Sequence, residues 1–330
     1  MKKSITESVK VDYHRYKFIS LISKGIRGYQ AMYRDIVSLV GGTPIVELKK
    51  LRKPGMARIL VKLEYMNPTG SHKDRIAVYM IREAEKQGLL KPGGVVVEAS
   101  SGNTALSIAW IAAQLGYKAI LVVEKGVSPI KIGLIKALGA TVIEVSGGYD
   151  EVLKTAQKIA RNEGGVFLNQ YDNEANVKAH YETTAREIYM QVGDAINAFV
   201  MGIGTCGTIA GVAMYLKEKI KNVRIIGVVP RGSAISKSLG AIGERIEGLS
   251  HDSIPSIYIR YRRLIDRIED VGFEDALKCM KDAIRFEGIM GGLSTGANLY
   301  IALRIAEELM DGTVVTLAPD SVMRYLHLIS

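Results

Sequence analysis

A lysine at residue 73 is the side chain in this sequence best placed to do chemistry. It follows a turn that contains Pro68 and Gly70, and an amphipathic run begins at Ile76. A lysine at such a junction can be kept away from bulk water, and desolvation lowers the pKa of an amine. An amine with a lowered pKa can form a Schiff base with a carbonyl compound. The alternative is a solvated lysine at the start of a helix, which is the usual situation for this residue type.

A turn of small polar residues follows the apolar stretch that begins at Val95. The turn reads SSGNT at residues 100–104, and we expect a helix from Leu106 to Leu115 that stops at Gly116. Hydroxyl groups and the backbone N–H groups at a helix N-terminus together make a site for a carboxylate. An ordinary N-cap is the alternative interpretation. The candidate residues of this turn are Ser100, Ser101, Gly102, Asn103 and Thr104.

A glycine-rich loop at residues 202–208 reads GIGTCGT. It has the spacing of the dinucleotide fingerprint, but that motif requires an acidic residue about 20 positions later. The corresponding stretch, residues 225–231, contains no acid. Backbone N–H groups in front of a helix, expected here at Ile209–Ile220, can still bind a phosphate. The candidate phosphate-binding residues are Gly204, Thr205, Cys206, Gly207 and Thr208.

A third segment of small residues, GGLSTGA at residues 291–297, precedes a helix expected at Asn298–Met310. An N-cap serine is again the alternative interpretation. Taken together and in this order, the segments resemble those of the cysteine synthase and cystathionine β-synthase family, whose members use pyridoxal phosphate. The resemblance covers the chain from about residue 37 to its end. The matching segments are 40–48, 67–75, 100–104, 169–176, 180–188, 202–208, 291–297 and 320–326.

The resemblance implies roles for the residues around the cofactor. Lys73 would hold pyridoxal phosphate as a Schiff base and later act as the general base. The amide of Asn103 would bind the ring oxygen, and the loop 204–208 would bind the phosphate. Ser294 would face the pyridine nitrogen. A neutral hydroxyl at that place suits β-elimination and replacement better than transamination.

The substrate would be held by a second set of residues, again by resemblance. The turn 100–104 would take its carboxylate, and Gln170 matches the family's substrate-contacting glutamine. Two departures from the family pattern stand out. Cys206 occupies a family glycine and would be strained if the position requires a positive φ. His72 replaces an apolar residue and is similar to the His-Lys pair of tryptophan synthase β chains.

The expected reaction is β-replacement, in which O-acetylserine or O-phosphoserine and sulfide give L-cysteine. Condensation of serine with homocysteine, as in cystathionine β-synthase, is the alternative within the family. A threonine synthase or a serine/threonine dehydratase is more distant. An alternative of a different class is a non-catalytic homologue that binds a partner.

Arg245 is a candidate ligand for the phosphate of O-phosphoserine. It lies shortly before Ile254 and Pro255, which border the substrate mouth in the family, and a guanidinium group binds a phosphate through two parallel hydrogen bonds. A surface arginine paired with Glu244 or Glu247 is the alternative.

Short β-branched runs bounded by glycine alternate with helical patterns, which predicts an α/β fold with buried parallel strands. The resemblance implies a two-lobed, tryptophan-synthase-β-like fold with the cofactor in the cleft. A large lobe would comprise residues 37–82 and 177–330, a small mobile lobe 83–176, and a helical extension 1–36. The expected strands are Arg58–Leu63, Val95–Glu98, Ala119–Val123, Thr141–Val145, Val166–Leu168, Ala198–Met201, Val223–Val228 and Thr313–Leu317.

The composition is that of a globular enzyme: 330 residues, 48% hydrophobic and 24% charged. No apolar run approaches the roughly 20 residues of a membrane span, and the N-terminus lacks a secretory core, so we expect a cytoplasmic protein. The expectation of a homodimer rests on the family resemblance. Two cysteines offer neither a disulfide framework nor a metal-ligand spacing. The net charge of +10 is spread along helices among acidic residues, so we expect no nucleic-acid partner.

Overall fold

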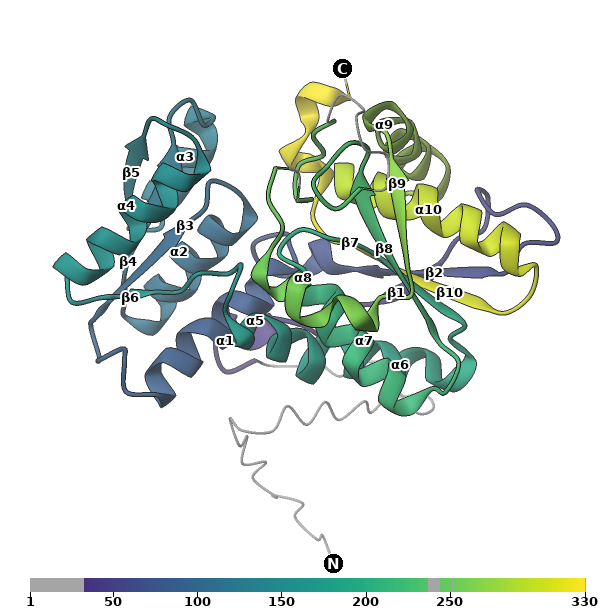
Figure 1. The fold of residues 1–330 in the computed structure, drawn as a ribbon, viewed down its shortest axis with the longest axis horizontal. Helices are drawn as coiled ribbons and strands as arrows, with labels where there is room; N and C mark the ends of the chain where they lie inside the picture. The colour runs from purple at the N-terminus through teal and green to yellow at the C-terminus, as the bar shows by residue number, and fades with distance from the viewer. Residues whose placement is uncertain (1–32, 237–243, 251, 330) are drawn as a thin grey trace, which may run out of the picture.

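The structure, a computed structural model, describes residues 33–236, 244–250 and 252–329. Most of the N-terminal extension expected at residues 1–36 therefore lies outside the described residues. Two β-sheets, each covered by helices, make up the described chain (Figure 1). The predicted α/β fold with mostly parallel sheets is confirmed.

The larger sheet has six strands in the order β1-β2-β10-β7-β8-β9. Adjacent strands in this sheet run parallel, except that β1 pairs antiparallel with β2. The chain leaves this sheet after β2 and returns to it at β7, so the sheet joins segments far apart in sequence. Its strands are β1 (Ile45–Glu47), β2 (Arg58–Leu63), β7 (Ala198–Gly202), β8 (Arg224–Pro230), β9 (Arg267–Val271) and β10 (Thr313–Ala318).

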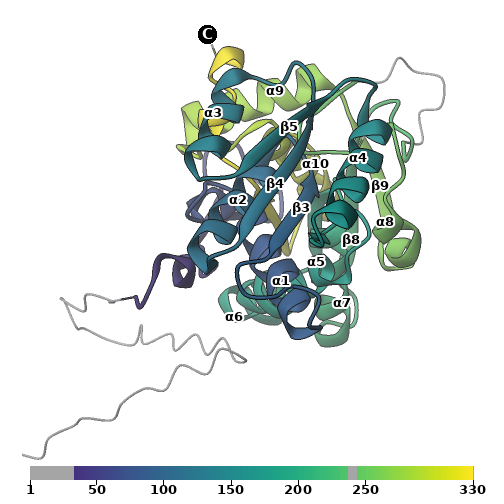
Figure 2. The same cartoon turned by 90° about the vertical axis from the view of Figure 1, so that its left-hand side faces the viewer.

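The smaller sheet has four parallel strands in the order β5-β4-β3-β6. Successive side chains of a strand point to opposite faces. Val96 therefore packs with the cluster of α1 (Lys73–Lys86) and α2, and Val97 packs with Ala156 of α4. Figure 2 shows α2 and α3 on one side of these strands and α4 on the other. The elements are β3 (Val95–Ala99), α2 (Asn103–Leu115), β4 (Lys118–Glu124), α3 (Pro129–Ala137), β5 (Thr141–Val145), α4 (Tyr149–Asn162) and β6 (Val166–Phe167).

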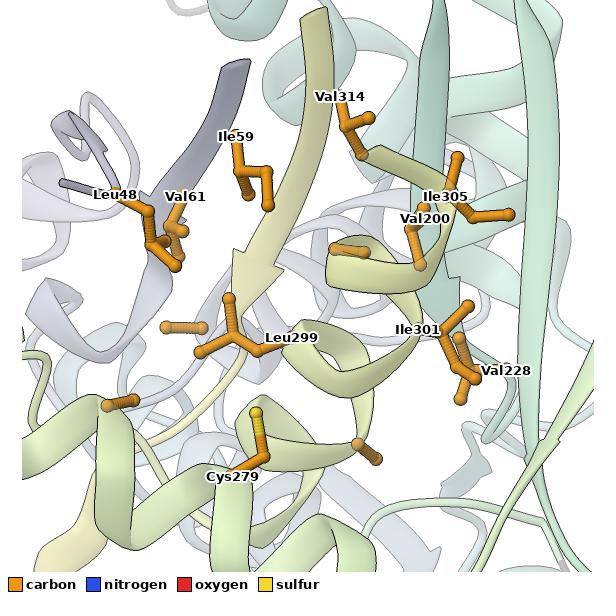
Figure 3. Packing of buried hydrophobic residues seen from close by; sticks show 14 of the residues in the cluster. Leu48, Ile59, Val61, Val200, Val228, Cys279, Leu299, Ile301, Ile305 and Val314 are labelled. Carbon is orange, nitrogen blue, oxygen red and sulfur yellow. The ribbon is translucent and has the colours of Figure 1, made fainter. Parts of the chain in front are cut away.

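Helices cover both faces of the larger sheet. Val200 and Val314 of the sheet share one buried hydrophobic cluster with Ile301 of α10 and Cys279 of α9 (Figure 3). Phe199, on the opposite face, joins the cluster of α6 and α7. The remaining helices are α1 (Lys73–Lys86), α5 (Glu174–Ala179), α6 (Arg186–Val192), α7 (Gly207–Lys219), α8 (Ser256–Tyr261), α9 (Phe273–Asp282) and α10 (Leu293–Leu309), and a π-helical turn spans His180–Ala185.

The eight expected strands all occur, with ends that shift by at most two residues. Two further strands, β1 and β9, were not predicted. Among the residues that the structure describes, no helix is long and apolar enough to cross a membrane.

Candidate active site

A pocket lies at the carboxyl ends of β7 and β10, where parallel α/β sheets usually bind their ligands. It collects residues from segments far apart in sequence. Its lining consists of His72, Lys73, Asn103, Met201, Gly202, Gly204, Thr205, Cys206, Thr208, Gly248, Leu249, Ser294, Asn298, Pro319 and Asp320. A second, more open groove between α1, α5 and α7 has none of the predicted site residues in its described lining.

Lys73 is the first residue of α1 and is half-buried in this pocket. Burial lowers the pKa of its amine to about 8, and the negative charges of Glu98 and Asp320 oppose the shift. Among the described residues, no hydrogen bond or salt bridge engages its Nζ. An amine with this pKa is neutral in a larger fraction of molecules near pH 7 than an ordinary lysine is. Lys73 therefore has the properties of a nucleophile and a base.

The neighbouring Asp74 fastens the start of this helix. Its carboxylate accepts hydrogen bonds from the Thr69 backbone N–H at 2.8 Å and from the Ser107 hydroxyl at 2.6 Å. Since Ser107 belongs to α2, the contact also ties α1 to the helix that carries Asn103. Through Asp74, the backbone next to Lys73 is held by the preceding turn at Thr69 and by α2 at Ser107.

The glycine-rich loop joins β7 to α7. Cys206 is the N-cap of α7 and has a φ of 72°, so the position does have the left-handed conformation in which cysteine is strained. A Cβ on Gly207 would lie 1.9 Å from Asn176 Oδ1, and one on Gly204 would lie 2.4 Å from the Gly248 carbonyl oxygen. Glycine is therefore required at both positions. The first N–H groups of a helix have no partner within it, so the loop is suited to an anion such as phosphate.

The side chains of Thr104 and Gln170 meet, although 66 residues separate them. The Thr104 hydroxyl donates to Gln170 Oε1 at 2.6 Å, and the Gln170 backbone N–H donates to Glu98 Oε2 at 3.3 Å. Asn103, at the start of α2, lines the pocket. Three other predicted residues form the half-buried turn between β3 and α2: Ser100, Ser101 and Gly102.

Ser294 lies in the first turn of α10 and lines the pocket with only 4% of its surface exposed. Asn298, one turn further along α10, holds the strands in place. Its Oδ1 accepts the Gly202 backbone N–H at 2.7 Å, and its Nδ2 donates to the Leu317 carbonyl at 3.0 Å. The hydroxyl of Ser294 is therefore presented from a helix that is fixed to both central strands.

Arg245 is not brought to this pocket. Its guanidinium pairs with Asp252 at 2.8 Å and its side chain is 77% exposed. The acidic neighbours suggested as partners bind elsewhere, since Glu244 pairs with Arg231 and Glu247 pairs with Lys131. In this arrangement Arg245 is a surface arginine, and the pocket is approached instead by Gly248 and Leu249 of the same segment.

The sequence argument did not single out Asp320, Asn298 or Glu98. Asp320 belongs to the matching segment 320–326, which gave it no role. Glu98 is 1% exposed, and burial raises the pKa of its carboxyl to about 8, against the backbone N–H groups of Gln170 and Ala99 and the charge of Lys73. A single acid in an otherwise apolar strand was the available signal, because such groups are costly to bury.

Comparison of this sequence with known proteins identifies the family that the sequence motifs resemble. A profile of the family described as "Pyridoxal-phosphate dependent enzyme" matches residues 36–320. The chain is 36% identical over 296 residues to a cysteine synthase of Staphylococcus aureus, covering 88% of this chain and 95% of that protein. It is 38% identical over 297 residues to cysteine synthase B of Pseudomonas aeruginosa, covering 89% and 96%. A cystathionine beta-synthase of Apis mellifera is 38% identical over 311 residues, covering 90% of this chain and 61% of that protein.

Solved structures with the same architecture have related activities. The crystal structure of cysteine synthase from Entamoeba histolytica superposes with a TM-score of 0.85 at 34% identity, covering 92% of each chain. That of O-ureido-L-serine synthase gives a TM-score of 0.85 at 33% identity, covering 90% of this chain and 94% of that one.

Proposed function

Because this chain belongs to the pyridoxal-phosphate-dependent enzyme family, and within it to the β-replacement enzymes of cysteine synthase type, we propose that it makes L-cysteine from O-acetylserine and sulfide. The observation that carries the proposal is the meeting of Lys73, Asn103, the loop 204–208 and Ser294 in one pocket.

The pocket fits the cofactor on structural grounds. The loop 204–208 lines the pocket directly in front of α7, where the free backbone N–H groups of a helix N-terminus can bind a phosphate. Two polar atoms in the pocket wall, His72 Nδ1 and Asp320 Oδ1, are buried without a hydrogen-bond partner among the described residues. In the proposed arrangement Lys73 holds the cofactor covalently, Asn103 and Ser294 contact its ring, and the loop holds its phosphate.

Bound pyridoxal phosphate supplies an electron-withdrawing ring system that stabilises negative charge at the substrate Cα. The side chains supply the rest of the reaction. Lys73 Nζ takes the proton from Cα, the Cβ–O bond breaks, and acetate leaves with the bonding electrons. The sulfur of hydrosulfide then forms a bond to Cβ, and Lys73 returns the proton to Cα. Thr104 and Gln170, held together by their hydrogen bond, bind the substrate carboxylate with the turn 100–104.

The charges around the pocket favour O-acetylserine over O-phosphoserine as donor. Of the described lining residues, Lys73 is the one lysine or arginine, and the carboxyl group of Asp320 lies in the same wall. Burial and the charge of Lys73 lower the pKa of His72 well below its usual value, so His72 adds no positive charge. A phosphate dianion at the leaving-group position would therefore meet little compensating charge.

The test is an assay of the purified holoenzyme with a matrix of donors and nucleophiles. O-acetylserine, O-phosphoserine and serine are each combined with sulfide and with homocysteine, and products are identified by mass spectrometry. We expect L-cysteine from O-acetylserine and sulfide at the highest kcat/KM. Faster formation of cystathionine from homocysteine would contradict the proposal, and a higher kcat/KM with O-phosphoserine would contradict the choice of donor.

A further inference from the structure

Asp320 is a buried acid in the wall of the pocket with an unusual set of contacts. It follows Pro319 after the end of β10 and is 2% exposed. Its Oδ2 accepts two hydrogen bonds, one from Asn103 Nδ2 at 2.7 Å and one from the Tyr325 hydroxyl at 2.7 Å. Its Oδ1 is buried and has no hydrogen-bond partner among the described residues.

The contact with Asp320 fixes the orientation of the Asn103 amide. A carboxylate oxygen only accepts hydrogen bonds, whereas an amide has two N–H donors on one side and an acceptor on the other. The nitrogen of Asn103 must therefore face Asp320. One of its two N–H groups is used by this bond, and no other residue that the structure describes engages the second, which can donate to an acceptor in the pocket.

The surroundings hold Asp320 in this position. A Cβ on Gly292 would lie 2.4 Å from Asp320 Oδ1 and 2.2 Å from the ring of Tyr325, so both side chains use the space that a glycine leaves. The Gly292 backbone N–H also donates to the Asp320 carbonyl at 2.9 Å. Because Gly292 is the N-cap of α10, the acid is seated against the start of the helix that carries Ser294.

We propose that Asp320 is a positioning residue: it orients the amide of Asn103 so that one N–H points at the ring oxygen of the bound cofactor. The inference rests on the proposed function, because it takes pyridoxal phosphate as the pocket's occupant. Without Asp320 the amide can rotate and present its oxygen, which would repel the oxygen of the cofactor. The bond also joins α2, on the smaller sheet, to the end of a strand of the larger sheet, so it couples the cofactor contact to the relative position of the two sheets.

The test compares Asp320→Leu, Asn103→Leu, the double variant and Asp320→Asn. The readouts are the Kd of pyridoxal phosphate and the visible absorption maximum of the bound cofactor, both measured without donor or sulfide. Asp320→Leu should weaken cofactor binding about tenfold and shift the absorption maximum in the same direction as Asn103→Leu. The double variant should lose little more than either single variant, because the two residues act through one contact. Asp320→Asn keeps an acceptor oxygen and should restore the Kd to within about threefold of the wild type.

A Kd and spectrum of Asp320→Leu equal to those of the wild type would overturn the proposal, as would strictly additive losses in the double variant. Should Asp320→Leu fail to fold, Asp320→Ser carries the same test, because its shorter side chain does not reach Asn103. A wild-type protein that binds the cofactor but makes no cysteine would contradict the proposed reaction. The comparison of cofactor Kd values and spectra among the variants would still test the role of Asp320.

Discussion

The residues of the pocket are distinguished by how far they are removed from water. Burial is the largest cause of the pKa shifts of Lys73, Glu98 and Asp320, lowering the first and raising the other two. Displaced pKa values of this kind cluster at sites of chemistry. The charge state of these three groups is therefore the property that experiments at the residue scale should address.

The pH dependence of Lys73 reactivity follows from its lowered pKa of about 8. Only the neutral amine is nucleophilic, and the neutral fraction rises as the pH increases through the pKa. In apoprotein, the rate of Lys73 acetylation by acetic anhydride should rise about tenfold per pH unit and become constant above about pH 8. Peptide mass spectrometry measures this rate, with a lysine in an unstructured peptide as control. A rate that continues to rise to about pH 10, as for an ordinary lysine, would contradict the account.

Cys206 stores strain because its φ of 72° brings its Cβ close to the backbone. Cys206→Gly relieves this strain but also removes a buried thiol. The matched control is Cys206→Ala, which removes the thiol and keeps the Cβ. We expect the free energy of unfolding of the glycine variant to exceed that of the alanine variant by about 1 kcal/mol. Urea titration measures the difference, and an alanine variant as stable as the glycine variant would refute it.

Most residues of the pocket could be predicted from the sequence, because they lie in short local motifs. Lys73, Asn103, Ser294 and four residues of the loop 204–208 were expected in one site and do line one pocket, although their roles stay predictions. The bond from Asn103 to Asp320 joins residues 217 positions apart, and no local pattern reports such a contact. Arg245 was expected in the pocket because of its guanidinium chemistry and its place before Ile254 and Pro255, and neither gives the direction of the side chain.

The elements that carry the pocket residues were predicted best where they are buried. The inner strands are continuous β-branched runs and were found, whereas β9 reads RIEDV, a half-buried edge strand whose charges mask its pattern. Three helices begin earlier than expected, at Asn103, Gly207 and Leu293. Small polar and glycine residues form the first turn of each helix, and these residue types are typical of turns when sequence alone is considered.

Helix α1 is anchored by a buried ionic network that lies two residues beyond Lys73. Arg75 pairs with Glu64 of the turn after β2 and with Glu187 of α6, each at 2.7 Å. Lys62 of β2 pairs with Glu187 at 2.9 Å. Burial raises the pKa of Glu64, but the Arg75 guanidinium more than offsets this effect, so the pKa lies below its usual value. Two cations and two anions thus compensate each other.

Removal of Arg75 should therefore be severe, because it leaves two buried carboxylates with one cation. We expect Arg75→Met to lower the free energy of unfolding by about 3–5 kcal/mol. The control on the same helix is Arg82→Met, which removes an exposed pair with Glu85 and should cost about 0.5 kcal/mol or less. Denaturant titration compares the two variants. Similar losses in both would show that the network does not anchor the helix.

At the scale of the whole molecule, the pocket is assembled from parts that belong to different sheets. Asn103 begins a helix packed on the smaller sheet, while Asp320 follows a strand of the larger one. Lys131 of α3 pairs with Glu247 at 2.5 Å, and Glu247 directly precedes Gly248 and Leu249 of the pocket lining. We propose that residues 83–176 move as the small lobe and that this pair favours the closed position.

Breaking the pair should weaken donor binding more than stability. An ion pair of partly exposed groups contributes about 0.2–1 kcal/mol, so Lys131→Ala should raise the KM for the donor about 1.4- to 5-fold. The matched control is Lys136→Ala, at an exposed position of the same helix. Glu247→Ala should resemble Lys131→Ala, and the double variant should add little. Equal KM values for the Lys131 and Lys136 variants would show that the Lys131–Glu247 pair does not favour the closed position.

The central claim is that Lys73 is the residue that carries the cofactor, and one measurement tests it most directly. The holoenzyme is treated with borohydride, which makes the lysine–cofactor bond permanent, and the digested protein is mapped by mass spectrometry. We predict the pyridoxyl phosphate group on the peptide that contains Lys73, and no labelled peptide and no turnover in Lys73→Ala. Label on a different lysine, or full turnover in Lys73→Ala, would contradict the account.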